Sequence, residues 1–435
     1  KIRLLLNQIK MAKIRSVRGM NDIPPKEVLS WVYAEEIIRS TFSSYGYQEI
    51  RFPVVESTEL FSRSNQASDM VSKEMYTFED KGGDSISLRP EGTASCVRAC
   101  IDNDLIRIDS PRLWYKGPMF RYERPQKGRS RQFHQSSVEV FGIHGPEIDA
   151  EIIQLSSRLW KKLGIEENVY LEINSIGNEN TRLNYTKDLL EFFAPLRENL
   201  DDDLVRKLHE NPLRILDSKS PEIQSLLKGA PKITDYLDEE SENHFRKLIN
   251  ILEMLGISYA VNPNLVRGLD YYNKTVFEWK TSSLGSQDTV CAGGRYDNLI
   301  EELGGKACPA IGFSIGMERL ILLLQDSGDS KLVEDQSVDC FFVCFGDESI
   351  LKAMVLAEQI RDRIPSLNLK VNLGSESAGS QFKKADKSGA RFALVLGDTE
   401  LEDKVISCKD LREKSEQETM DIESLIDKLE NSFKK

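Results

Sequence analysis

The spacing of apolar residues changes along the chain, and each change predicts a different element. Over residues 27–45 the apolar and aromatic side chains recur every three or four positions, which predicts an amphipathic helix that ends at Gly46. Residues 47–56 read as a strand, and Pro53 within it favours a sheet edge or interface, because proline donates no ladder hydrogen bond. A second amphipathic helix is predicted over 150–165.

Strand patterns dominate the stretches that lie between and after these helices. The segments 85–92, 112–123 and 133–143 are rich in β-branched or aromatic residues and are bounded by glycine, proline or aspartate, which predicts antiparallel strands. Residues 178–256 are instead charged, helical in pattern and broken by prolines, which predicts an inserted helical subdomain. Strand and glycine character returns over 258–320.

The last quarter of the chain has a different order of elements. Alternating strand and helix patterns after residue 338 favour a small α/β domain with parallel strands, followed by a final helix over 421–434. We therefore expect four parts: an N-terminal extension (1–13), an α+β catalytic domain with an antiparallel sheet (14–325), a linker (326–337) and a C-terminal α/β domain (338–435). Because Met11 begins a segment typical of a natural start, residues 1–10 are left out of the fold prediction.

Charge is distributed unevenly along the chain. The net charge of −12 and the pI of about 5.2 argue weakly against a purely electrostatic nucleic-acid binder. Residues 112–131, however, contain seven basic residues and one acidic residue, Glu123. A basic run is most often a solvated loop, but this one stands out against an acidic background.

Cysteine and histidine usage predicts neither disulfides nor a structural metal. The seven cysteines form no CxxC pair, and the four histidines form no zinc-like cluster. Two cysteine pairs, Cys96 with Cys100 and Cys340 with Cys344, have a spacing typical of core positions. We expect reduced thiols and a cytoplasmic location, and no membrane association, because no apolar run reaches the roughly 18 residues that span a bilayer.

The stretch 121–139 suggests chemistry on a nucleotide, although the chain has neither a GxxxxGK[ST] motif nor a GxGxxG motif after a strand. Activation of a carboxylate by ATP brings two anions together, and arginine side chains offset that repulsion. An aromatic ring suits adenine. The stretch supplies arginines, then Phe133, then Gln135 and Glu139, which strand alternation places on one side.

These segments resemble the signatures of class II aminoacyl-tRNA synthetases. "FRYERPQKGRSRQF" is similar to the second signature, and "AIGFSIGMERLILLL" is similar to the third. The helix–strand unit 27–56 fits the first signature, which builds the dimer interface in that class. "LVRGLDYYNKTVFEW" and "AGGRYDNLI" resemble the two histidine-specific signatures of the histidyl-tRNA synthetase family, and "SLRPEGTASCVRA" its amino-acid loop. "QFKKADKSGARFALVLGDTE" resembles the anticodon-binding domain of the same family.

The resemblance, to the bacterial and organellar type of the family, implies a homodimeric ligase. Such an enzyme joins L-histidine to tRNA(His) through histidyl-adenylate, with ATP as a substrate that carries Mg²⁺, and it releases AMP and pyrophosphate. The resemblance also implies a class II catalytic domain and a C-terminal anticodon-binding domain. The discriminating pocket satisfies both imidazole nitrogens, so no editing domain is expected.

The resemblance assigns site residues one by one. Catalysis falls to Arg121 and Arg267, the second of which takes the place of a metal at the α-phosphate. The expected ATP-binding residues are Arg121, Glu123, Arg129, Phe133 and Arg319. The expected histidine-binding residues are Glu91, Gly92, Thr93, Arg121, Gln135, Glu139, Arg267, Tyr271 and Tyr272. Among these, Glu91, Thr93 and Gln135 would bind the amino group, and Glu139 and Tyr272 would read the imidazole.

Simpler interpretations of several of these residues stay open. Arg267 also fits a surface ion pair, and the two tyrosines also fit core packing. The cluster formed by Lys383, Lys384, Lys387 and Arg391 suits either a phosphate footprint or a solvated helix face. Residues 127–131 are expected to touch the acceptor end of tRNA. The sequence does not show which of Arg124, Lys127 and Arg131 contact ATP, which contact tRNA and which face solvent.

A second class of function also fits part of the resemblance. Non-enzymatic relatives of this family sense histidine as regulatory subunits of the first enzyme of histidine biosynthesis. They generally lack the C-terminal domain and the catalytic arginines, both of which this sequence has.

Overall fold

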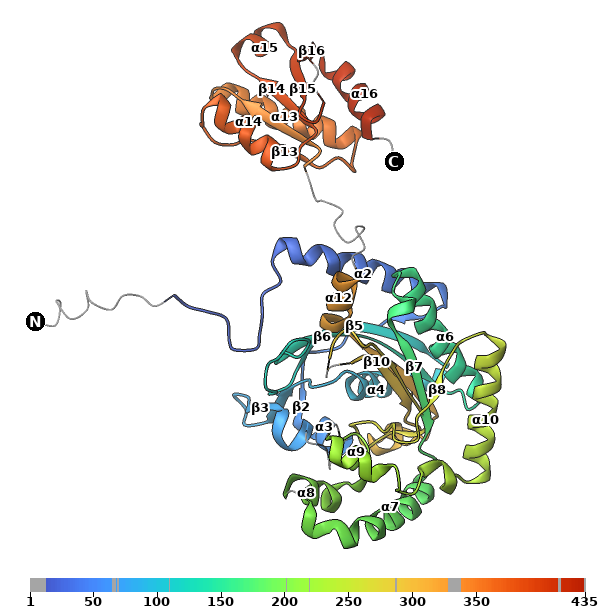
Figure 1. The fold of residues 1–435 in the computed structure, drawn as a ribbon. Helices are drawn as coiled ribbons and strands as arrows, with labels where there is room; N and C mark the ends of the chain where they lie inside the picture. Colours follow the sequence, from blue (N-terminus) through green and yellow to red (C-terminus); the bar gives the residue numbers. More distant parts are fainter. Residues whose placement is uncertain are drawn as a thin grey trace, which may run out of the picture. The chain divides into compact units, whose positions relative to one another are not determined.

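The structure is a computed structural model that describes residues 13–64, 68, 70–108, 110–200, 202–218, 220–285, 288–327, 338–413 and 416–433. The chain forms two compact units, Lys1–Leu332 and Val333–Lys435 (Figure 1). No helix within the described ranges is long and apolar enough to cross a membrane.

The first unit is built around an eight-stranded sheet. Its strand order is β1-β5-β6-β11-β10-β9-β7-β8. The strands are β1 (Gln48–Glu49), β5 (Arg112–Phe120), β6 (Gln132–Phe141), β7 (Tyr170–Ser175), β8 (Ala260–Val261), β9 (Asn273–Lys280), β10 (Thr289–Arg295) and β11 (Ala310–Gly316). The pairs from β5 to β7 are antiparallel, and only the outermost pairs, β1 with β5 and β7 with β8, are parallel. The predicted antiparallel α+β fold is confirmed.

The prediction of one continuous strand over residues 47–56 is wrong. This segment contributes to two short strands that lie in different sheets. β1 pairs with β5, whereas β2 (Val55–Ser57) joins β4 (Ser85–Leu88) and β3 (Tyr76–Glu79) in a three-stranded sheet. Pro53 lies between the two strands and has no N–H to continue a ladder. The Arg89 guanidinium satisfies the carbonyl groups at this break, since its Nη1 donates to the oxygens of Phe52 and Pro53 at 3.2 and 3.3 Å.

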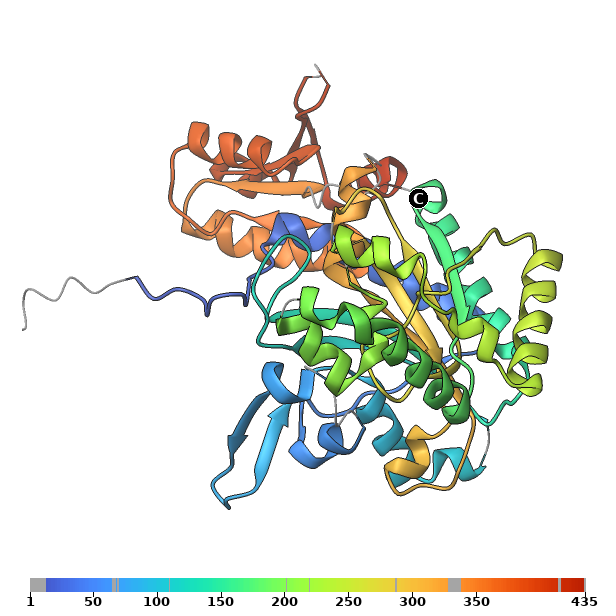
Figure 2. The same ribbon diagram turned by 60° about the horizontal axis from the view of Figure 1, so that its bottom comes forward.

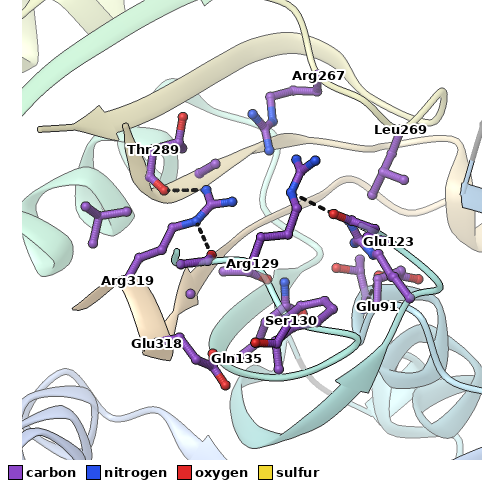
Figure 3. Close-up of a pocket in the computed structure, with 18 of the residues that line it drawn as sticks. Glu91, Glu123, Arg129, Ser130, Gln135, Arg267, Leu269, Thr289, Glu318 and Arg319 are labelled. Carbon is purple, nitrogen blue, oxygen red and sulfur yellow. Dashed lines mark hydrogen bonds and ion pairs between the residues drawn. The ribbon is translucent and has the colours of Figure 1, made fainter. Parts of the chain in front are cut away.

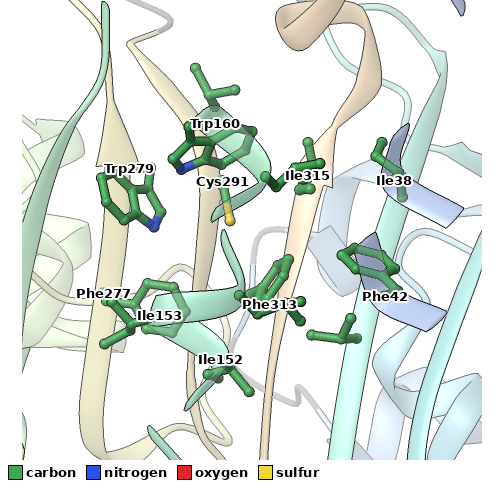
Figure 4. Close-up of a cluster of buried hydrophobic side chains, with 14 of the residues drawn as sticks. Ile38, Phe42, Ile152, Ile153, Trp160, Phe277, Trp279, Cys291, Phe313 and Ile315 are labelled. Carbon is green, nitrogen blue, oxygen red and sulfur yellow. The ribbon is translucent and has the colours of Figure 1, made fainter. Parts of the chain in front are cut away.

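One face of the large sheet is covered by long helices. These are α2 (Pro25–Ser44), α6 (Pro146–Lys162), α10 (Glu239–Met254) and α12 (Met317–Asp326). Their apolar side chains and those of the strands form one core, in which the Phe313 ring lies edge-on to Phe42 and Phe277 at centroid distances of 6.1 and 6.3 Å (Figure 4). Both predicted amphipathic helices therefore exist and bury the predicted faces.

The opposite face of the sheet holds a second core and the inserted helices. Strand alternation sends Trp114 into the first core and Tyr115 into the second. The helices and turns on this side are α3 (Thr58–Ser64), the π-helical turn Met70–Glu74, α4 (Thr93–Asp102), α5 (Leu105–Ile108), α7 (Glu179–Phe193), α8 (Asp202–Glu210), α9 (Pro221–Leu227) and α11 (Leu299–Glu302). The helical character predicted for 178–256 is confirmed. Its last helix, α10, nevertheless buries Phe245, Leu248 and Leu252 in the core of the main sheet.

The second unit is a five-stranded sheet of order β13-β12-β14-β15-β16 with helices. Its elements are β12 (Cys340–Cys344), α13 (Asp347–Arg363), β13 (Leu369–Val371), α14 (Ala378–Lys387), β14 (Phe392–Leu396), α15 (Asp398–Asp403), β15 (Ile406–Asp410), β16 (Glu418–Met420) and α16 (Ile422–Phe433). The three predicted parallel strands are present, and two antiparallel strands that the sequence pattern did not reveal extend the sheet. Residues 328–337 of the predicted linker, and residues 1–12, lie outside the described part of the chain.

Candidate active site

A cavity of about 200 Å³ opens on the face of the large sheet that carries α4 (Figure 3). It lies over strands β6, β10 and β11, and the loop between β5 and β6 and the loop before β9 form its walls. The structure brings to this cavity most of the residues that the sequence predicted: Glu91, Thr93, Arg121, Glu123, Arg129, Phe133, Gln135, Arg267, Tyr271, Tyr272 and Arg319. Gly92 and Glu139 are not among the lining residues.

The loop between β5 and β6 carries a linked set of charged side chains. Arg129 Nε lies 2.6 Å from Glu123 Oε2. Arg121 Nε donates to the carbonyl of Pro90 at 2.8 Å, and its guanidinium lies 5.3 Å from the centre of the Phe133 ring. Guanidinium groups held in this way keep their remaining N–H donors for an anion.

Arg319, at the start of α12, anchors the opposite wall of the cavity. Its Nε donates to the Gly128 carbonyl at 3.1 Å and its Nη1 to the Thr289 carbonyl at 2.8 Å (Figure 3). Burial, together with the positive charge of Arg129, lowers the pKa of Arg319 from its ordinary value. An anionic ligand next to Arg319 would therefore stabilise the charged guanidinium and offset the costs of its burial and of its repulsion by Arg129.

Arg267 enters the cavity from the loop before β9. Its Nη1 is paired with the Glu278 carboxylate, and its Cζ lies 5.9 Å from the centre of the Tyr272 ring. Burial acts to lower the pKa of Arg267, but Glu278, Tyr272 and Asp217 together outweigh it and the pKa is raised. The Nε of Arg267 is buried without a hydrogen-bond partner among the described residues. A surface ion pair does not describe this environment.

One end of the cavity is lined by acceptors. Both oxygens of Glu91 accept backbone N–H groups at the start of α4, from Thr93 at 2.6 Å and from Ala94 at 2.9 Å. Burial raises the pKa of Glu91, although these N–H groups and Arg121 partly offset the effect. The Oε1 of Gln135 is buried and accepts no hydrogen bond from the described residues. Both side chains line the cavity, and each is an acceptor of the kind that an ammonium group requires.

Glu139 lies below the floor of the cavity rather than on it. Its Oε1 accepts hydrogen bonds from Thr93 Oγ1 and Tyr115 OH, both at 2.9 Å, and its Oε2 accepts one from Tyr296 OH. The residue is 1% exposed. Burial raises the pKa of Glu139 to about 8, with the three hydroxyl donors acting in the opposite direction.

Two glycines make room for this buried carboxylate. Gly312 stands opposite Glu139 in the register of β11 with β6, and a Cβ at Gly312 would overlap the Glu139 carboxylate. A Cβ at Gly92 would overlap the ring of Tyr115. Gly92 therefore lies below the cavity surface, where the absence of a side chain leaves room for the Tyr115 ring.

Three tyrosine rings pack around the same carboxylate. The centroids of Tyr271 and Tyr272 are 4.7 Å apart, and those of Tyr271 and Tyr296 are 5.6 Å apart. Burial raises the pKa of each of the three phenols, so they are hydrogen-bond donors at neutral pH. Core packing and lining of the cavity are thus combined in Tyr271 and Tyr272.

Sequence reasoning missed several residues of the site. Tyr115 and Tyr296 hold Glu139, and Thr289 and Glu318 line the cavity. Tyr296 lies within "AGGRYDNLI" and Glu318 immediately precedes Arg319, so adjacency to those motifs was the available signal. Tyr115 had no such signal. Among the described residues, no group of three or more histidine, cysteine, aspartate or glutamate side chains could hold a metal ion.

Comparison with known proteins agrees with this geometry. Residues 19–320, more than half of the chain, match the family model described as histidyl-tRNA synthetase. The chain belongs to the histidyl-tRNA synthetase family. Residues 339–432 match the family described as an anticodon binding domain.

Solved structures of histidyl-tRNA synthetases share the fold over nearly the whole chain. The apo enzyme of S. aureus is 35% identical, with a TM-score of 0.79, and the alignment covers 96% of this chain and 100% of that one. The enzyme of Nostoc sp. PCC 7120 is 21% identical, with a TM-score of 0.67 and coverage of 97% and 100%. A Bacillus halodurans protein described as an ATP phosphoribosyltransferase regulatory subunit/histidyl-tRNA synthetase is 21% identical, with a TM-score of 0.65 and coverage of 89% and 99%. The last two show a common fold.

As a histidyl-tRNA synthetase, this chain is a ligase that charges tRNA(His) with histidine. The antiparallel catalytic sheet and the separate C-terminal unit are the two parts that this activity uses, one for the chemistry and one for the anticodon.

Proposed function

We propose that the cavity forms histidyl-adenylate from L-histidine and ATP, and that the histidyl group then passes to the terminal ribose of tRNA(His). One observation carries the proposal. The side chains of Arg121, Arg267 and Arg319 line one cavity together with Glu91 and Gln135, whose Oε1 accepts no hydrogen bond from the described residues. Such a cavity suits a triphosphate at one end and a zwitterionic amino acid at the other.

The first step joins two anions. A carboxylate oxygen of histidine attacks the α-phosphorus of ATP, the bond from that phosphorus to the bridging oxygen breaks, and pyrophosphate leaves. Arg121 and Arg267 act as the catalytic residues, because their guanidinium groups offset the repulsion and stabilise the charge that grows on the α-phosphate oxygens. The Nε of Arg267, which is buried and has no hydrogen-bond partner among the described residues, is a donor suited to this role.

The remaining charged groups of the cavity bind ATP. Phe133 and Arg319 provide the two faces against which adenine stacks, and Glu123 and Arg129 contact the nucleotide from the β5–β6 loop. Mg²⁺ arrives as part of the triphosphate substrate. AMP and pyrophosphate are the products.

The histidine end selects its amino acid through hydrogen bonds. Glu91, Thr93 and Gln135 bind the α-amino group, with Tyr271 shaping the pocket and Gly92 leaving it room. Tyr272 satisfies one imidazole nitrogen at the cavity surface. Glu139 is assigned to the other nitrogen, and because it lies below the floor, the imidazole has to enter past the present cavity surface to reach it. An amino acid without those nitrogens leaves buried polar groups unpaired, a discrimination of roughly 10⁴.

Several wider properties follow from family membership and sequence. We propose a cytoplasmic homodimer that pairs through the 27–56 unit, with residues 14–325 as catalytic domain, 326–337 as linker and 338–435 as anticodon-binding domain. The acceptor end of tRNA approaches the loop around Lys127, where backbone contacts position the RNA without reading sequence. In the C-terminal cluster, Lys384 on α14 is paired with Glu376, and Arg391, which precedes β14, is paired with Asp410; these ion pairs favour the solvated-surface interpretation for both side chains.

A histidine-sensing regulatory role is the competing function. A sensor needs the residues that bind histidine but has no use for an ATP site built from Glu123, Arg129, Phe133 and Arg319. The presence of these residues and of the 338–435 domain supports the enzyme instead.

Amino-acid-dependent exchange between ATP and pyrophosphate, measured with each of the twenty amino acids, tests the proposal. We expect exchange with histidine alone. Absence of exchange with histidine would reject adenylate formation, whereas exchange with another amino acid would reject only the assigned specificity.

A further inference from the structure

The segment that precedes α2 lies against the base of the β5–β6 loop. The backbone N–H groups of Arg131 and Gln132 both donate to the Gly19 carbonyl, at 2.7 and 3.2 Å. Asn21 Nδ2 donates to Ser130 Oγ at 3.3 Å. The residues in contact are more than 100 positions apart in the chain, so residues 17–22 form a strap across this loop (Figure 2).

The contact is close enough to require glycine in the strap. Gly19 has a φ of +82°, which side chains rarely adopt. A Cβ at Gly19 would lie 2.9 Å from both Arg131 Cγ and Pro125 Cγ. A side chain at this position would therefore push the strap away from the loop as well as strain its backbone.

The far side of the same loop is fastened by Arg319, which donates to the Gly128 carbonyl at 3.1 Å. Between the contact with Gly19 and the contact with Arg319, Arg131 links the strap to Arg121 and Glu123. Its carbonyl accepts the backbone N–H of Arg121 at 2.9 Å, and its Nε donates to the Glu123 carbonyl at 3.2 Å. Movement of the loop base therefore displaces the groups that face the cavity.

We propose that the strap, residues 17–22 with Gly19 at its centre, is a positioning element that holds the β5–β6 loop in its ATP-binding geometry. The inference rests on the proposed roles of Glu123 and Arg129 in ATP binding. The strap touches no substrate. It acts by fixing the loop before ATP arrives, so that binding does not have to order it.

Gly19→Ala, compared with Gly256→Ala, tests the strap in the full chain. Gly256 is a matched control because its φ is +68°, nothing lies within 4 Å of the position of its Cβ, and it lies outside both the cavity and the proposed dimer interface. Both variants suffer backbone strain, and only Gly19→Ala also meets the loop. We expect Gly19→Ala to raise the KM for ATP by about tenfold in pyrophosphate exchange, since small misplacements of substrate-positioning groups are costly. The KM for histidine should stay the same, and Gly256→Ala should change neither constant.

A third variant, Arg129→Ala, separates this inference from the function on which it rests. If Arg129→Ala raises the KM for ATP and Gly19→Ala behaves like Gly256→Ala, the strap proposal is overturned and the ATP site stands. If neither Arg129→Ala nor Gly19→Ala alters the KM for ATP, both are overturned. Equal loss of ATP and histidine binding in Gly19→Ala would also overturn the strap, because it indicates general damage.

Asn21→Ala keeps the proposal testable if Gly19→Ala does not fold. This substitution removes the hydrogen bond to Ser130 and leaves the backbone unstrained. The expected result is a rise of about threefold in the KM for ATP alone, the size of one modest hydrogen bond. An unchanged KM for ATP would overturn the proposal.

Discussion

Replacement of Arg267 by alanine separates substrate binding from adenylate formation. The substitution removes a guanidinium from the cavity. Its partner, Glu278, whose side chain is 10% exposed in the native protein, then loses this ion pair. Two other groups stay near that carboxylate. Thr289 Oγ1 donates to its Oε2 at 3.0 Å, and Lys280 Nζ lies 3.5 Å from the same atom.

The expected magnitudes follow from these contacts. Loss of one partner from a buried ion pair costs about 3–5 kcal/mol. Because Thr289 and Lys280 remain, we expect a stability loss near or below the lower end of that range. In the reaction, loss of one preorganised donor at the α-phosphate should slow adenylate formation by about 10²- to 10³-fold, or about 3–4 kcal/mol. Histidine should still bind, since the acceptors Glu91 and Gln135 are untouched.

The assay is pyrophosphate exchange for the chemical step together with titration calorimetry for histidine binding. Arg107→Ala is the matched control, because Arg107 is 68% exposed at the side chain and forms an ion pair with Asp104 at 3.5 Å. Arg267→Lys keeps the charge but loses the planar fork, and an intermediate rate is expected. A folded Arg267→Ala protein with exchange within threefold of wild type would refute the assignment of Arg267 to the transition state.

Three further predictions concern the floor of the cavity and its aromatic wall. Tyr296→Phe removes the hydrogen bond that Tyr296 OH donates to Glu139 and should raise the KM for histidine about fivefold, the size of one buried hydrogen bond, without changing the KM for ATP in the exchange assay; a parallel change in both constants would contradict this. Burial raises the pKa of Glu139 to about 8 from 4.5, so unfolding releases a proton between these values. Wild-type stability should therefore fall as pH rises through this window and that of Glu139→Gln should fall less; equal falls in thermal midpoint between pH 5.5 and 8.5 would count against it. Phe133→Leu should weaken ATP binding about fivefold through lost stacking and spare histidine binding, as seen in the two KM values; unchanged ATP binding would exclude Phe133 from the adenine site.

Segments with a clear apolar pattern made the fold predictable from sequence, and polar segments did not. Helices α2 and α6 were predicted because each repeats its apolar spacing over several turns. β15 (ISCKD) and β16 (ETM) were missed because their charged and polar residues interrupt the continuous apolar run that marks β12 and β14. The break at Pro53 was seen, but its consequence, strands in two different sheets, depends on pairing partners far away in the chain.

The site was predictable where its residues cluster in motifs, and unpredictable where distant strands supply single side chains. Arg121, Arg267 and Arg319 each lie in a recognisable segment. Tyr115 lies on β5, among apolar neighbours that read as core, and it reaches Glu139 only because β5 and β6 pair in one particular register. Strand alternation correctly placed Glu139 on the cavity side of β6. It could not show that Glu139 lies below the cavity surface, because that position depends on the hydroxyl groups of Thr93, Tyr115 and Tyr296 that surround it.

The glycines beneath the cavity have an evolutionary consequence. Gly312 and Gly92 admit the Glu139 carboxylate and the Tyr115 ring at positions where any side chain would collide. Replacing either glycine disrupts the packing around Glu139 and Tyr115. Replacing Glu139 by an apolar residue leaves the hydroxyls of Thr93, Tyr115 and Tyr296 without their acceptor. On the proposed assignment of Glu139 to the imidazole, we therefore expect single substitutions in this layer to lose activity before they gain a new amino-acid specificity, so that redesign has to exchange the layer together.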